Sequence, residues 1–342
     1  MRNNFTKCIG FLCVLLISNG VHAADSKGYS EHPEAEKWLL RMASEDFSTT
    51  YLRSVLEDAK KQDSILAAMN RPAEKRLDWG GYRQIFLQSK RIHRGVDFWQ
   101  EHAETLARAA QVYGVPAEVI VAIIGIETHY GRNTGSYRAL DALATLGFDY
   151  PRRADFFQEQ LKDLLVLARN EKLNVADLKS SYAGAMGYGQ FIPSSFLAYA
   201  VDFDGDGDKD LWNSPVDAIG SVANYFLVHG WQHNGEVVVS VTLEGTLPEE
   251  QINTGEEPVR PLSEWQALGV NVNLHNRGNV AAVLLRMKDQ DKASYWLGLN
   301  NYYVITRYNR SRLYAMAVHE LSQAIAAEKN AANSPIKKVN AE

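Results

Sequence analysis

Cysteine is nearly absent from the sequence. The 342 residues include two, Cys8 and Cys13, and both lie within the first 23 residues, which have the pattern of an export signal. The mature chain can therefore form neither a disulfide nor a thiolate metal site. Its stability must come from packing and from any metal that it binds. Lipid attachment at Cys13 is disfavoured, because Leu12 is not the small residue that such a site requires.

Long hydrophobic runs are also missing. The apolar stretch at residues 9–17 is shorter than the roughly 20 apolar residues of a spanning helix. It follows Arg2 and Lys7 and precedes a small-residue cleavage site at residues 21–23, which is the order of a secretory signal. We therefore expect residues 1–23 to be removed, and the mature protein to be soluble and without a transmembrane segment.

The chain has no excess of positive charge. Its formal net charge is −5, and loss of the signal leaves 34 basic against 41 acidic residues, a net charge of −7. Proteins that bind nucleic acid gain affinity by neutralising phosphates with basic side chains. We therefore expect no nucleic-acid partner.

Hydrophobic spacing indicates a mainly helical chain. With 46% hydrophobic and 23% charged residues, the sequence is that of a globular protein. Two segments rich in β-branched residues, 237–243 and 280–287, predict strands. The fold class is therefore α+β, predominantly α-helical. Helical patterns occur at residues 34–42, 48–61, 98–113, 116–130, 154–170, 216–228 and 313–329.

Glu127 closes an unusually apolar helix. Every residue from 119 to 126 is apolar or glycine, so this helix is predicted to be buried on all sides. Burial and the negative end of the helix dipole both disfavour a carboxylate, so the pKa of Glu127 should be raised. Glu127 is therefore a candidate proton donor. The alternative is a structural glutamate bonded to His129, Arg132 or a backbone N–H.

A glycine-rich segment follows. Residues 184–191 contain three glycines and end with Gln190 and Phe191, so the backbone must approach another group closely there. A tight packing turn would need such a segment. A sugar-binding cleft would need one as well, since amides bind acetamido groups and flat rings pack on pyranose faces.

Residues 202–208 have the pattern that opens an EF-hand calcium loop. Asp202, Asp204 and Asp206 occupy the first, third and fifth positions, Gly207 the sixth, and Asp208 would supply its backbone carbonyl from the seventh. The closing glutamate is missing. The alternative is an acidic surface turn without a metal.

Three segments together resemble the lytic murein transglycosylase B family: residues 126–128, residues 184–195 and residues 308–311. The resemblance extends over roughly residues 34–327. It implies a lysozyme-like core that cleaves the β-1,4 bond between N-acetylmuramic acid and N-acetylglucosamine in peptidoglycan. Cleavage in that family adds no water and leaves a 1,6-anhydromuramyl end. Glu127 matches the single catalytic glutamate, which acts first as acid and then as base.

The resemblance also assigns binding residues. Ser181 matches a hydroxyl near the glutamate, and Arg152 and Arg153 match a pair that meets carboxylates of the substrate. The closing ligand of a longer calcium loop falls on Asp217, so a structural Ca²⁺ is expected and no cofactor for catalysis. The residues matching the sugar-contacting cleft are Gln190, Phe191, Tyr82, Tyr225, Tyr308, Asn309 and Tyr314. Core packing of the tyrosines and a solvated surface pair of arginines are the alternatives.

The implied organisation is a signal followed by several regions. A helical N-terminal region precedes the lysozyme-like catalytic core with its EF-hand-like loop, a small β-containing subdomain is inserted, and the chain returns to the core with a C-terminal helix and a polar tail. These regions are residues 24–95, 96–235, 236–299, 300–329 and 330–342. We expect a periplasmic monomer that acts on peptidoglycan glycan strands, with other cell-wall enzymes as candidate partners.

Two other functions remain open at this point. A lysozyme-type hydrolase of the same polymer would share Glu127 and use water as the nucleophile. A second carboxylate, which ordinary glycosidases need, has no specific setting here, and Asp141 and Asp149 are candidates only by proximity in sequence. A calcium-dependent glycan-binding protein without catalysis would gain nothing from burying an acid.

Overall fold

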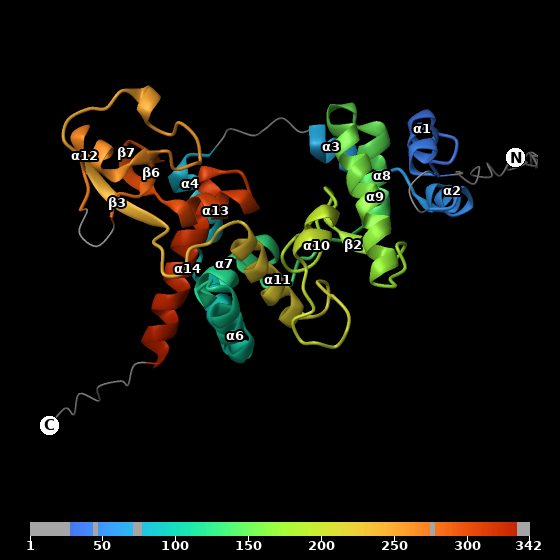
Figure 1. Cartoon of the computed structure of the whole chain (residues 1–342), viewed down its shortest axis with the longest axis horizontal. Helices are drawn as coiled ribbons and strands as arrows, with labels where there is room; N and C mark the ends of the chain where they lie inside the picture. The colour runs from blue at the N-terminus through green and yellow to red at the C-terminus, as the bar shows by residue number, and fades with distance from the viewer. Residues whose placement is uncertain (1–27, 44–46, 71–76, 274–277, 334–342) are drawn as a thin grey trace, which may run out of the picture.

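Helices form most of the chain. The computed structural model describes residues 28–43, 47–70, 77–273 and 278–333. The predicted signal at residues 1–23 lies outside the described residues, as do residues 334–342 of the tail. Figure 1 shows the larger sheet at one end of the molecule, α1 and α2 at the other, and α7 and α11 between them.

The first half of the chain runs through nine helices and a minimal two-stranded sheet in the described ranges. The helices are α1 (Pro33–Met42), α2 (Thr49–Asp58), α3 (Asp63–Asn70), α4 (Trp79–Phe86), α5 (Ser89–Glu101), α6 (Ala103–Tyr113), α7 (Ala117–Thr128), α8 (Ala139–Asp149) and α9 (Ala154–Asn170). A 3-10 turn, η1 (Pro151–Arg153), joins α8 to α9, and β1 (Tyr137–Arg138) pairs with β2 (Lys179–Ser180).

The second half combines helices with the larger sheet. Its helices are α10 (Pro193–Tyr199), α11 (Pro215–Val228), α12 (Leu262–Ala267), α13 (Asn300–Tyr308) and α14 (Arg312–Asn333), and a 3-10 turn, η2, covers Glu249–Gln251. The strands are β3 (Val238–Leu243), β4 (Arg260–Pro261), β5 (Val270–Asn271), β6 (Ala281–Asp289) and β7 (Lys292–Gly298).

α7 is the central helix. Helices α5, α6, α11 and α14 pack around it, and its residues 119–126 are all buried, as predicted. The helix ends at Thr128 rather than near Tyr130. It ends earlier because His129 adopts a left-handed conformation, with φ of 53°, and terminates it. α14, which packs along α7, continues to Asn333, so residues 330–333 of the predicted tail are helical.

The larger sheet has its own hydrophobic core. Its strands are antiparallel in the order β4-β6-β7-β3-β5. Leu262, Trp265, Leu284 and Leu297 belong to a buried cluster separate from the helical core. The predicted strands correspond to β3 and β6. The strand β7 was not predicted, because its first three residues are exposed and it therefore has no alternating pattern.

The N-terminal helices dock on α8 through polar contacts. Tyr29 donates its hydroxyl hydrogen to Asp149 at 2.5 Å, and Lys61 binds the same carboxylate at 2.9 Å. Asp141 accepts the backbone N–H of Lys60 at 2.9 Å. Both aspartates considered as second carboxylates are therefore occupied in joining these helices to the core.

Among the described helices, none alone is long and apolar enough to cross a bilayer. The pair α6 and α7 meets that requirement only when taken together, and the two are bent by 113° at the break between them.

Candidate active site

Glu127 lies in the last turn of α7, which is fixed to a neighbouring loop. The Thr128 hydroxyl lies 3.1 Å from the Ile124 carbonyl and 3.0 Å from the Tyr188 carbonyl, and it accepts the Gly131 N–H at 3.0 Å. These contacts hold the end of the helix against the glycine-rich segment. The position of the Glu127 backbone is thereby set from two sides.

Arg91, on α5, braces the same helix end. Its guanidinium donates to the Gly125 carbonyl at 2.8 Å and to Nε2 of His129 at 2.7 Å, and its own carbonyl accepts the Tyr130 hydroxyl at 2.9 Å. Arg91 is buried, and burial lowers its pKa. Its role could not be predicted from the sequence, because an arginine within an amphipathic helix carries no signal of an internal contact.

The Glu127 carboxyl is bonded to a tyrosine from the last helix. Tyr314, on α14, donates its hydroxyl hydrogen to Oε1 of Glu127 at 2.5 Å. Burial raises the pKa of Glu127 to about 7, and the Tyr314 hydrogen bond opposes that rise because it favours the carboxylate. The predicted rise is confirmed. The partner is Tyr314, however, and neither His129 nor Arg132.

Two more tyrosines surround this carboxyl. Burial and then the Glu127 charge raise the pKa values of Tyr82, on α4, and Tyr308, at the end of α13. Tyr308 donates its hydroxyl hydrogen to the Gly189 carbonyl at 2.5 Å. The structure thus brings Glu127, Tyr82, Tyr308 and Tyr314 together from four helices.

The glycine-rich segment is a loop whose backbone approaches another segment closely, as predicted. Met186 and Phe191 pair through two backbone hydrogen bonds of 2.8 and 2.9 Å, which enclose residues 187–190. Gly187 has φ of 68°, and a Cβ there would lie 2.2 Å from the Leu211 carbonyl oxygen. Only glycine fits this close approach.

Gln190 and Ser181 hold this loop in shape. Gln190 has φ of 52°, and its side-chain amide donates to the carbonyls of Thr134 at 3.1 Å and Gly187 at 2.9 Å. The Ser181 hydroxyl accepts the Ala185 N–H at 3.2 Å. The Gln190 carbonyl oxygen is the part of that side chain left for a ligand.

The remaining cleft residues occupy different environments. Phe191 is 2% exposed and packs against Tyr225 and Tyr308, so its ring offers no open face to a sugar. Tyr225 donates its hydroxyl hydrogen to the Arg307 carbonyl at 2.6 Å. Asn309 follows α13 directly and is exposed.

Arg152 and Arg153 lie in the η1 turn between α8 and α9. Both are exposed, and the Arg153 guanidinium lies 4.1 Å from the centroid of the Phe156 ring. No described contact connects either arginine to Glu127 or Tyr314.

Three of the five predicted metal ligands meet. Carboxylate oxygens of Asp202, Asp204 and Asp217 lie within 4.8 Å of one another. The Asp206 carboxylate is not part of this cluster and accepts the Asp208 N–H at 3.0 Å. Asp208 was expected to contribute its backbone carbonyl, which a cluster of carboxylates does not test.

Asp217 organises the loop from α11. It is 1% exposed and accepts backbone N–H groups of Phe203 at 2.7 Å and Asp210 at 2.9 Å. Asp210, which was not among the predicted residues, accepts the N–H groups of Trp212 and Asn213, both at 2.9 Å. Its place before a turn is the available signal, since aspartate often bonds to backbone two or three residues on.

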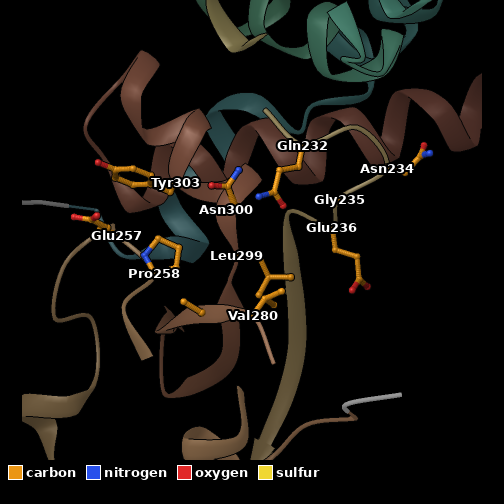
Figure 2. Close-up of a pocket in the computed structure, with 11 residues that line it drawn as sticks. Gln232, Asn234, Gly235, Glu236, Glu257, Pro258, Val280, Leu299, Asn300 and Tyr303 are labelled. Carbon is orange, nitrogen blue, oxygen red and sulfur yellow. The ribbon is translucent and has the colours of Figure 1, made fainter. Parts of the chain in front are cut away.

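A large cavity lies away from these residues. About 840 Å³ in volume, it is bounded by the connection from α11 to β3, by the start of α13 and by the sheet. In the view of Figure 2, the lining residues Asn300 and Gln232 lie between Glu257 on one side and Glu236 on the other. None of the residues that the sequence assigned to the site lines it.

Comparison with known proteins identifies the family. The Transglycosylase SLT domain family matches residues 30–323. The membrane-bound lytic murein transglycosylase B of Escherichia coli (strain K12) is 44% identical over 308 residues, which are 87% of this chain and 84% of that protein.

Solved structures agree with this match. The soluble lytic transglycosylase SltB1 from Pseudomonas aeruginosa is 48% identical with a TM-score of 0.84, covering 87% of this chain and 100% of that one. The Escherichia coli lytic transglycosylase Slt35 in complex with calcium is 43% identical with a TM-score of 0.80, covering 91% and 98%. SltB3 from Pseudomonas aeruginosa, in complex with NAG-anhNAM-pentapeptide, is 29% identical with a TM-score of 0.75, covering 85% and 78%.

These matches confirm the predicted fold class, a helix-dominated α+β protein with a lysozyme-like core. They also favour catalysis over glycan binding alone. The chain belongs to the transglycosylase SLT family and is a lytic transglycosylase of peptidoglycan.

Proposed function

We propose that Glu127 is the one catalytic acid and base, and that it converts a muramyl unit of peptidoglycan into its 1,6-anhydro form. This proposal rests on the environment and the pKa of the Glu127 carboxyl group. It lies at the end of an apolar helix, is bonded to Tyr314, and has a pKa of about 7. A group with that pKa can both give and take a proton near neutral pH.

The reaction requires two proton transfers through this carboxyl. Protonated Glu127 gives its proton to the glycosidic oxygen as the bond from that oxygen to C1 of the muramyl sugar breaks. The resulting carboxylate then takes the proton of the C6 hydroxyl while O6 bonds to C1. Because Oε1 accepts from Tyr314, the transferred proton is carried by Oε2. Glu127 ends protonated, and no water is consumed.

The contacts of Asp141 and Asp149, the two candidates for a second carboxylate, favour O6 over water as the nucleophile. Asp141 and Asp149 are engaged with the N-terminal helices. A substrate-assisted route, in which the N-acetyl carbonyl stabilises the sugar cation, needs no second carboxylate. The SltB3 complex contains an anhydro sugar.

The cleft residues have different parts in this proposal. Tyr82, Tyr308 and Tyr314 line the position of the reacting sugar, and Gln190, Asn309 and Ser181 contribute polar contacts from the loops. Phe191 and Tyr225 pack against Tyr308 and hold its ring in place. Arg152 and Arg153 meet substrate carboxylates farther along the strand.

The loop before α11 would bind a structural Ca²⁺. Asp202, Asp204 and Asp217 converge, and like charges this close repel one another unless a cation offsets them. Asp206 and the Asp208 carbonyl are the further ligands expected. The calcium complex of Slt35 supports this choice of metal.

The cellular setting follows from the signal and the substrate. We propose that the chain is exported to the periplasm, where it acts on glycan strands as a monomer. Its regions have the boundaries given by the sequence, except that the C-terminal helix continues to Asn333. Other cell-wall enzymes are its candidate partners.

Mass spectrometry of products tests the reaction. Residues 24–342 acting on purified peptidoglycan should release muropeptides lighter by one water than the reducing-end species. Reducing ends in their place would make the enzyme a hydrolase.

Replacement of Glu127 tests the acid. Glu127→Gln keeps the shape but cannot transfer a proton, so the rate should fall by at least about 100-fold, within the range that general acid–base catalysis contributes. Glu159→Gln, a mostly exposed position on α9, is the control and should keep full activity. Retention of more than about a tenth of the wild-type rate by Glu127→Gln would exclude Glu127 as the acid.

A further inference from the structure

A second cavity, of about 730 Å³, adjoins the site of Glu127. Tyr82, whose pKa is raised by burial and by the Glu127 charge, forms part of its wall, and Ile85 lines the cavity from the same helix. The opposite wall comes from the loop at Asn253 and from Arg286 on β6. The cavity therefore lies between the helical core and the sheet, next to the reacting carboxyl.

Three arginines line this cavity, and two of them have acidic partners. Arg286 makes a paired contact with Glu249, at 2.5 Å from each terminal nitrogen. Arg310 lies 3.7 Å from Glu256, and its side chain is 88% exposed. The charge of Arg286 is therefore offset within the protein, and that of Arg310 is mostly solvated.

Arg312 has no such partner among the residues that the structure describes. Its guanidinium makes one long hydrogen bond, 3.4 Å to the Asn253 carbonyl. Within the ranges that the structure describes, no carboxylate oxygen lies within 4.0 Å of its nitrogens. Arg312 is half-buried, so its charge is only partly solvated. A guanidinium has five N–H donors in a planar fork that matches a carboxylate.

The position of Arg312 relates it to the reaction. It is the first residue of α14, and Tyr314, which bonds to Glu127, lies two residues further on. A sugar held at Glu127 and over Tyr82 therefore has substituents within reach of this cavity. N-acetylglucosamine has no carboxylate, whereas the muramyl unit bears a lactyl group that is either free or joined to a stem peptide with carboxylates of its own.

We infer that Arg312 is the receptor for a carboxylate of the peptidoglycan strand bound at Glu127. This inference rests on the proposed function. A bidentate bond from the guanidinium would fix the register of the strand, because the acid-bearing unit recurs at every second sugar. The carboxylate comes from the stem peptide or from the free lactyl group, and the substrates chosen below separate these sources.

Steady-state kinetics on three substrates tests the inference. They are soluble glycan strands with stem peptides, strands freed of peptides, and the peptide-free strands with their carboxyl groups converted to methylamides. Arg312→Gln should raise KM about tenfold or more on the carboxylate strands that use this contact, with kcat within about threefold. On methylamide strands, wild type and variant should have the same KM. If the KM rises on strands with stem peptides, the carboxylate belongs to the peptide. If it rises on peptide-free strands, the carboxylate belongs to the lactyl group.

Two further variants separate charge from structure. Arg83→Gln also removes an arginine between α4 and α14, where it is paired with Glu320 at 2.8 Å, and its KM should stay within about twofold of wild type. Arg312→Lys keeps a cation but loses the fork, so its KM should rise several-fold on carboxylate strands only. If Arg312→Gln does not fold, the KM values of Arg312→Lys alone test the inference.

The results that overturn the inference differ from those that overturn the proposed function. An unchanged KM for both Arg312 variants on carboxylate strands, or an equal rise on methylamide strands, rejects the receptor and leaves the role of Glu127 intact. Activity of Glu127→Gln rejects the catalytic assignment, whatever the Arg312 variants show.

Discussion

Single residues set the protonation of the reacting carboxyl. Burial at the end of α7 raises the pKa of Glu127, and the Tyr314 hydroxyl partly opposes it. The sequence was enough to predict the first effect, because an apolar run that ends in glutamate implies a desolvated acid. It was not enough to predict the second, because the two residues are 187 positions apart.

Removing the Tyr314 hydroxyl should move the pH profile. Tyr314→Phe keeps the ring but deletes the donor that stabilises the carboxylate, so the pKa of Glu127 should rise above 7. Activity needs the protonated acid and falls as the pH rises through its pKa. The basic limb of kcat/KM should therefore shift upward, by about one pH unit for a hydrogen bond to a charged group.

The control is another buried tyrosine. The Tyr302 hydroxyl has no hydrogen-bond partner among the described residues, so Tyr302→Phe should leave the limb where it is. A limb that stays fixed or moves to lower pH in Tyr314→Phe would contradict the account of Glu127.

At the scale of elements, the loop before α11 illustrates how well a local pattern can be interpreted. The spacing of aspartates predicted the loop, and Asp217 was assigned by resemblance as the closing ligand. The structure brings Asp202, Asp204 and Asp217 together. A pattern within one loop can be predicted because its residues are neighbours in sequence.

Calcium should stabilise the protein through this loop. Binding to the folded state alone adds about 1.4 kcal/mol at 10 times Kd, which millimolar Ca²⁺ reaches for a Kd of about 10⁻⁴ M, so Tm should rise with millimolar Ca²⁺ and fall with a chelator. Asp202→Asn combined with Asp204→Asn should abolish the rise. Asp177→Asn, in a neighbouring exposed turn, should retain it. A wild-type Tm that does not change up to several millimolar calcium would remove the metal from the account.

Elements without a periodic pattern were harder to predict. The helix α7 was predicted from its continuous apolar run at residues 119–126, which Glu127 closes. The helix α8 is buried at nearly every position and has no polar face, and it was not identified. The strand β7 changes from exposed to buried along its length, so neither alternation nor a continuous apolar run marks it.

At the scale of the whole molecule, the site is a junction of distant segments. Tyr82 comes from α4, Glu127 from α7, Tyr308 from α13 and Tyr314 from α14. The sheet contributes the far wall of the adjoining cavity through Arg286. Composition and motifs predicted the fold class, and the resemblance proposed the residues, but their contacts depend on packing between elements that no local pattern encodes.

The mature chain should begin at Ala24. If residues 1–23 are an export signal, the intact mass of the periplasmic protein should match residues 24–342 without modification. A lipid-modified chain beginning at Cys13 would show that the protein is anchored, as the name of its Escherichia coli relative says of that protein. A Cys13→Ala variant should have the same mass and location as the wild type.

The dependence of the site on α14 has a consequence for the newly made chain. An exported polypeptide emerges with its N-terminus first, and its earlier segments fold first. A nascent chain that has emerged only through α13 has Glu127 but lacks the hydroxyl that binds it and the arginine beside it. Full activity therefore requires the last helix, which also packs along α7, and we expect a chain that ends before α14 to cut poorly.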